Sequence, residues 1–199
     1  RLVCNNVNCK EKKIAEIVHF VSSLEIMDLS EKRIEQLLDC GVINGISDLY
    51  KINEEDFKKI PKSGDVLAKK LFKQIQASKK TKLDKFMAAL GIAGGSRKWK
   101  KIIEAGFNSI EKILNLKKEE ISEIKTFADK SAEVLFNSLN TKKDLIKDLL
   151  DCGFTFEKIE ENGNKLEGLS FCITGPLSEK REVIEERIIK NGGKAASSV

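Results

Sequence analysis

The sequence predicts a mainly α-helical protein made of repeated pairs of short helices, followed by a β-α-β segment. Three observations support this fold class. Pro occurs only twice in 199 residues, and Lys, Glu, Ile and Leu, which favour helices, are abundant. Apolar residues recur at helical spacing through most of the chain, and the last part of the chain changes to an alternating pattern. No stretch approaches the roughly 20 apolar residues that a membrane-spanning helix needs, so no membrane partner is expected.

The first helices follow from apolar spacing and capping residues. Residues 12–21 place four apolar side chains on one face, namely Ile14, Ile17, Val18 and Val21. Ser30 is a suitable N-cap for a second helix over residues 31–40, and Gly41 ends it. Three further helices are expected over residues 65–78, 83–90 and 99–105.

A unit of two helices joined by a short polar or Gly-containing turn repeats along the chain. We expect it near residues 29–41, 54–77, 84–105 and 118–139. A tight hairpin ahead of the second helix directs backbone N–H groups outward at a helix N-terminus, which is a phosphate-binding arrangement. A plain helical bundle with short turns would have the same composition, and the pattern alone does not distinguish the two.

The last third of the chain differs from the rest. Residues 157–167 are acidic, contain Asn and Gly, and predict a linker. Residues 169–174 alternate as in a strand, residues 181–191 predict a helix with Val183, Ile184 and Ile188 inward, and residues 195–199 predict a second, parallel strand. This segment is the opening of a β-α-β domain.

Positive charge is concentrated in one part of the sequence. The formal net charge is only +5, but the stretch from Lys58 to Lys101, the basic block, has 14 Lys and Arg against two acids, Asp65 and Asp84. A polyanion, most simply nucleic-acid phosphate, is the natural partner of such a block. The alternative is a sequence that overuses Lys, with solvated side chains that bind nothing.

The five cysteines fall into two groups. An odd number without a secretion signal indicates a reducing compartment. Cys40, Cys152 and Cys172 lie in apolar or helical surroundings and are expected to be buried thiols. Cys4 and Cys9 lie in a polar loop and are a candidate half-site for zinc, whose structural sites need four ligands. The sequence starts without Met just ahead of this pair, so we expect a piece of a longer protein.

Several short sequence motifs occur one after another along the chain. They are Cys4-x4-Cys9 with His19-Phe20-Val21-Ser22, Met27-Asp28 with Glu31-Lys32-Arg33-Ile34-Glu35-Gln36-Leu37, Asp48-Leu49-Tyr50, Ala89-Leu90-Gly91-Ile92, Leu169 to Gly175 with Leu177-Ser178 and Arg181, and Gly192-Gly193-Lys194. In order and spacing they resemble the carboxy-terminal half of bacterial-type NAD-dependent DNA ligases, over essentially the whole chain.

The resemblance implies four parts. Residues 1–22 would be a partial zinc-finger-like segment, residues 23–156 a tandem helix-hairpin-helix domain, residues 157–168 a linker, and residues 169–199 the start of a BRCT-like domain. The expected fold is therefore a helix-hairpin-helix bundle between a partial zinc finger and an incomplete β-α-β segment.

The resemblance also implies a function. The chain would be the non-catalytic, DNA-binding portion of a ligase, which grips duplex DNA around a nick during replication and repair. The basic block spans the second and third hairpins, so the expected DNA-binding residues are Lys62, Ser63, Gly64, Gly91, Gly94, Gly95 and Arg97, with Lys69, Lys70 and Lys98 as electrostatic support. Hairpins of this family typically read Gly-apolar-Gly. Only the third hairpin, with Gly91 and Gly94-Gly95, keeps its glycines.

Cofactors and partners follow from the same resemblance. Zinc would be structural, held by Cys4 and Cys9 as half of a site. NAD and magnesium belong to the catalytic part of such ligases, and the Lys-x-Asp-Gly motif that becomes adenylated is absent from this sequence. The chain alone should therefore be inactive. Expected partners are nicked double-stranded DNA and the adenylation and OB part of the same or another chain, in the cytoplasm and, if bacterial, at the nucleoid.

Two other functions are compatible with the sequence. The chain could be a scaffold subunit of a split ligase with weak DNA binding of its own. It could also be an unrelated helix-hairpin-helix repair protein, such as a nuclease accessory domain.

Overall fold

The computed structural model describes residues 9–61, 63–157, 166, 168–175, 179 and 181–196. The chain divides into two compact units, Arg1–Glu157 and Lys158–Val199. Within the described residues, no helix combines the length and the apolar character needed to cross a bilayer.

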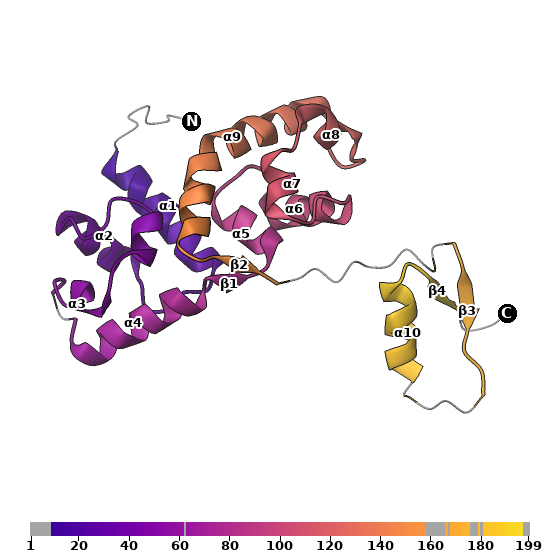
Figure 1. The fold of residues 1–199 in the computed structure, drawn as a ribbon, viewed down its shortest axis with the longest axis horizontal. Coiled ribbons are helices and arrows are strands. Elements are labelled where there is room, and N and C mark those ends of the chain that lie inside the picture. The colour runs from indigo at the N-terminus through magenta and orange to yellow at the C-terminus, as the bar shows by residue number, and fades with distance from the viewer. Residues whose placement is uncertain are drawn as a thin grey trace. The chain divides into compact units, whose positions relative to one another are not determined.

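The first unit is almost entirely helical, as the sequence predicts (Figure 1). Its elements in chain order are α1 (Lys10–Ser23), α2 (Glu31–Asp39), η1 (Ser47–Tyr50), α3 (Glu54–Phe57), α4 (Asp65–Ala77), β1 (Lys80–Thr81), α5 (Leu83–Ala89), α6 (Gly95–Glu104), α7 (Ile110–Leu114), α8 (Lys118–Glu123), α9 (Asp129–Asp151) and β2 (Thr155–Phe156).

The predicted repeat of helix pairs is confirmed. Four pairs are joined by short hairpins: α1–α2, α3–α4, α5–α6 and α8–α9. We name their connections hairpin 1 (residues 24–30), hairpin 2 (58–64), hairpin 3 (90–94) and hairpin 4 (124–128). The first pair uses α1, which begins well before the expected range of 29–41.

The core of this unit takes one apolar stripe from each helix. In α1 the predicted stripe is buried at Ile14, Ile17 and Val21. Trp99 of α6 and Phe86 of α5 are completely buried. Helices of this length are marginal alone, so their stability comes from this shared core.

The long helix α9 and the strand β2 close the unit. In Figure 1 α9 runs from α8 back to β1, where Lys80 pairs with Thr155 in a short parallel ladder. Aromatic contacts stabilise this arrangement. The ring centroids of Tyr50 and Phe154 lie 4.7 Å apart, and those of Phe86 and Phe156 lie 5.0 Å apart. Burial raises the pKa of the Tyr50 hydroxyl, which stays neutral.

Local expectations about the start of α6 and about three cysteines were wrong. Helix α6 begins at Gly95, not at Trp99, because its first residues are glycine and polar and give no apolar periodicity. Cys40 is exposed, and Cys152 and Cys172 are only half-buried. Cys40 is the C-cap of α2, where the chain turns outward, so the apolar helix before it does not bury the thiol.

The second unit contains a parallel β-α-β arrangement, as predicted. It consists of β3 (Ser170–Cys172), α10 (Arg181–Lys190) and β4 (Lys194–Ala196), with Ser170 opposite Lys194. Ile188 of α10 is buried, whereas Val183, expected inward, is exposed. A Cβ on Gly193 would lie 2.8 Å from Ile188 Cγ2, so glycine is required for the close approach of helix and strand.

Candidate nucleic-acid interface

Hairpin 3 has the backbone conformation that only glycine adopts without strain. Gly91, Gly94 and Gly95 have φ values of +69°, +118° and +60°, all in the left-handed region. Gly94 is the N-cap of α6, and the first turn of this ten-residue helix contains no acidic residue. The first N–H groups of a helix lack intrahelical partners, and they form a partly positive, anion-attracting end. One carboxylate already lies close, since the Ser96 hydroxyl donates to Asp84 at 3.2 Å.

Hairpin 3 is held against α9. A Cβ on Gly94 would lie 3.2 Å from Lys98 Cβ and 3.3 Å from Leu135 Cδ1, so a larger residue there would be tightly packed and its neighbours would have to shift. The Ala93 N–H donates to the Ser138 hydroxyl of α9 at 3.2 Å. The hairpin is therefore fixed by a helix that lies far away in the sequence.

Hairpin 4 also contacts α6. The Lys101 ammonium donates to the Thr126 hydroxyl at 2.9 Å. The Lys98 ammonium lies 5.3 Å from the centroid of the Phe127 ring, within cation–π range. Hairpins 3 and 4 thus form one structural unit around α6.

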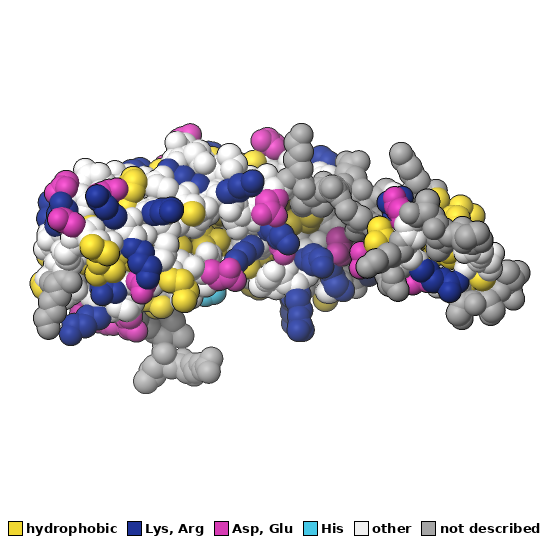
Figure 2. Space-filling view, turned by 90° about the horizontal axis from the view of Figure 1, so that it is seen from below, with side chains coloured by type: hydrophobic (Ala, Val, Ile, Leu, Met, Phe, Trp, Pro, Cys, Tyr) yellow, Lys and Arg dark blue, Asp and Glu magenta, His cyan; other side chains and the backbone are white. Residues whose placement is uncertain are grey.

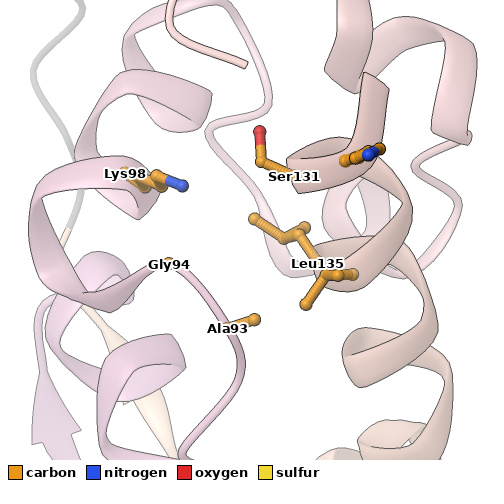
Figure 3. A pocket seen from close by; sticks show the side chains of 7 residues that line it. Ala93, Gly94, Lys98, Ser131 and Leu135 are labelled. Carbon is orange, nitrogen blue, oxygen red and sulfur yellow. The ribbon is translucent and has the colours of Figure 1, made fainter. Parts of the chain in front are cut away.

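A pocket of about 340 Å³ opens between hairpin 3 and the first turns of α9, and we call it the α6–α9 pocket. In Figure 3 the Lys98 side chain extends from α6 toward the side where Ser131 and Leu135 project from α9. Its lining consists of two lysines, a hydroxyl and an apolar remainder: Ala93, Gly94, Lys98, Lys130, Ser131, Val134 and Leu135. Two cations beside the N-terminus of α6 suit an anion, and the apolar remainder suits a hydrophobic group attached to it.

Hairpin 2 is built differently. Gly64 caps α4 with an ordinary φ of −84°, and the first turn of α4 contains Asp65. Asp65 pairs with Lys58 at 2.8 Å, and this contact lowers the pKa of the carboxyl. A carboxylate at the N-terminus of α4 therefore offsets the positive end of the helix. The Ser63 hydroxyl oxygen is buried without a hydrogen-bond partner among the described residues, and Lys62 lies outside them.

Part of the first unit matches a known protein family. A family model described as "SAM-like Helix-hairpin-helix tandem" matches residues 95–141, which contain α6, hairpin 4 and the first half of α9. The chain is also similar to curated bacterial proteins named DNA ligase. It is 32% identical to the one from Treponema denticola over 204 aligned residues, 35% to that from Thermodesulfovibrio yellowstonii over 204, and 34% to that from Chlamydia caviae over 202.

The chain is homologous to part of a bacterial DNA ligase. The matches cover 98–100% of the chain but only 30–32% of each of these relatives. The chain therefore spans about a third of the length of the ligases that it matches.

The lysines of this ligase relative differ in their surroundings. Within the described part of the chain, several cations of the basic block form no ion pair: Lys69, Lys73, Lys80, Lys82, Arg97, Lys98 and Lys100. Lys70 and Lys85 are instead paired with Asp28 and Glu25. On the face shown in Figure 2, cationic and acidic side chains are interspersed and form no uninterrupted basic patch.

Of the pocket residues missed by sequence reasoning, two are polar. Lys130 and Ser131 lie in the first turn of α9, outside the basic block and after a hairpin without glycine. Their position could have indicated them, because residues directly after a predicted hairpin lie at the N-terminus of the next helix.

The metal prediction concerns the start of the ligase homologue. Cys9 is the half-buried residue just before α1, and Cys4 lies outside the described residues. Across the part of the chain that is described, no group of three or more His, Cys, Asp or Glu side chains could hold a metal ion. A zinc half-site at Cys4 and Cys9 stays a prediction.

Proposed function

We propose that this chain is the DNA-gripping, non-catalytic portion of an NAD-dependent DNA ligase and that it holds duplex DNA around a nick. The observation that best supports this function is the α6–α9 pocket. It combines a glycine hairpin, a helix whose own first turn contains no acidic residue, and two lysines from different helices. The homology to DNA ligases and the charge of the basic block point to the same ligand.

The proposed contacts are with the DNA backbone. A phosphate would lie at the N-terminus of α6, where the left-handed glycines allow close approach of the main chain. Lys98 and Lys130 would flank it, and the apolar part of the pocket, including Leu135, would contact the attached sugar. Such contacts recognise no base edge, so the grip would be independent of sequence.

Catalysis would belong to another part of the ligase. The Lys-x-Asp-Gly motif does not occur in this sequence, so NAD and magnesium would act in an adenylation and OB part on the same or a partner chain. Cys4 and Cys9 would supply two of the four ligands of a structural zinc ion. The protein would work in the cytoplasm, on DNA.

The test is fluorescence anisotropy of a labelled nicked duplex titrated with the chain over a salt series. We expect binding that weakens steeply with salt, since the slope of log affinity against log salt is about −0.9 per neutralised phosphate. Charge reversal at Lys98 and Lys130 should weaken binding and flatten the slope. The matched control is Lys147→Glu, because Lys147 is equally a surface lysine of α9, 64% exposed. Absence of binding at low salt would reject the proposal and leave a scaffold subunit as the function.

A further inference from the structure

Hairpin 1 is strained and acidic where the other hairpins are basic or contain glycine. Glu25 and Asp28 have φ values of +59° and +64°, and they are the two non-glycine residues with positive φ in the described structure. The left-handed conformation is unfavourable for residues with a Cβ. The Arg33 guanidinium donates to the Asp28 carbonyl oxygen, which helps to hold this conformation.

Both strained residues pair with lysines of the basic block. The Asp28 carboxylate lies 2.6 Å from the Lys70 ammonium, and the Glu25 carboxylate lies 3.0 Å from the Lys85 ammonium. The pKa of Asp28 is lowered, chiefly by the hydrogen bond from Lys70, so this carboxylate is charged at neutral pH. Hairpin 1 therefore places two negative charges on a stretch that has only two acids of its own, Asp65 and Asp84.

The positions of the two lysines matter for a ligand of the hairpins. Lys70 is on α4, the helix that hairpin 2 leads into, and Lys85 is on α5, the helix that leads into hairpin 3. Lys69, next to Lys70, and Lys73, one turn along the same helix, form no ion pair with a described residue. Lys70 and Lys85 thus belong to the basic block, but each is already paired with a carboxylate of the chain itself. Neither is free to bind a polyanion unless that ion pair breaks.

We propose that Glu25 and Asp28 set the affinity of this chain for DNA by occupying Lys70 and Lys85 as internal substitutes for phosphate. This inference rests on the proposed function. A phosphate that uses either lysine must first displace a carboxylate, so hairpin 1 limits how many phosphates the basic block neutralises. Exposed ion pairs of this kind contribute little to folding stability, so their removal leaves the fold intact.

The experiment compares two pairs of neutralising substitutions. The test variants are Glu25→Gln, Asp28→Asn and their combination. The controls are Glu35→Gln, Asp39→Asn and their combination, because these carboxylates of α2 lie 3.1 and 2.7 Å from Lys10, outside the basic block. Test and control remove the same charges and break ion pairs of similar length.

Each variant is titrated against the nicked duplex across the salt series. The test double variant should bind several-fold more tightly than the wild type, with a slope steeper by about 0.9 for each lysine released. The control double variant should show a smaller gain and an unchanged slope. Equal effects in test and control would overturn the inference while leaving the DNA grip intact. If neither the wild type nor any variant binds at low salt, the proposed function fails and this inference with it.

Discussion

The ammonium of Lys98 lies 5.3 Å from the centroid of the Phe127 ring. A cation of the helix that follows hairpin 3 thus rests on a buried ring of hairpin 4. Hairpin 4 lacks glycine, but through this contact it fixes the direction of a lysine that lines the α6–α9 pocket. Its contribution to the interface is therefore to orient Lys98.

Replacement of Phe127 by Leu should weaken DNA binding without any change of charge. Leucine fills most of the buried volume but has no aromatic face for the Lys98 ammonium. A double-mutant cycle with Lys98→Met, measured as free energy of DNA binding, should give a coupling of about 0.5–1 kcal/mol. Additive effects would show that the ring does not orient the lysine.

Replacement of Gly94 by Ala should destabilise the fold and reduce DNA binding. The residue has φ +118°, and a Cβ would lie 3.2 Å from Lys98 and 3.3 Å from Leu135. The expected loss in free energy of unfolding is about 1–3 kcal/mol in urea titrations. The control is Gly45→Ala, where a Cβ would meet nothing within 4 Å. A stable Gly94→Ala protein with full affinity would contradict this role of the glycine.

Replacement of Phe154 by Ala should be among the most costly changes in the first unit. Its side chain is only 5% exposed, and the ring packs on Tyr50 and Phe86 at the closure between η1, α5 and β2. We expect a loss of about 3–5 kcal/mol in the free energy of unfolding. The control Val66→Ala, 84% exposed in the wild type, should stay within about 0.5 kcal/mol.

The capping box of α3 predicts a dependence of stability on pH. The Asn53 N–H and the Lys59 ammonium lower the pKa of Asp56 below its ordinary value of 3.8. A carboxyl whose pKa is lower in the folded state stabilises the fold above its unfolded pKa, and the contribution is lost as the pH falls through the folded value.

Asp56→Asn should therefore cost about 0.5–1 kcal/mol at neutral pH. The difference from the wild type should shrink in urea titrations as the pH falls through the lowered pKa of Asp56 and the wild-type carboxyl becomes protonated. Asp144→Asn, at an almost fully exposed position, should have no comparable effect. A difference between wild type and Asp56→Asn that is constant with pH would contradict the role of the charge.

The parts of the fold predicted correctly are those specified by local pattern. The stripe of α1, the start of α2 directly after Ser30 and the β-α-β segment all follow from spacing within a few residues. The N-terminus of α6 was placed too late because Gly95 to Lys98 have no apolar residue, although these residues form the first turn at the site.

The parts that sequence reasoning missed depend on distant pairs. Strands β1 and β2 have two residues each, and no local pattern connects Lys80 with Thr155. The same holds for Asp28 and Lys70, whose pairing turns a residue expected to support DNA binding into one already engaged. The sequence shows the positive charge of the basic block, but it does not show that Asp28 neutralises Lys70.

The pairing of β1 with β2 also bears on how the chain is made. Hairpins 3 and 4 both lie between these two strands in the sequence. During synthesis from the N-terminus, Tyr50 lacks the ring of Phe154, and Phe86 lacks the ring of Phe156, until the end of the first unit has left the ribosome. A nascent chain that has passed Gly95 but not yet reached Phe154 would present all the glycines of hairpin 3 on a core that is still open.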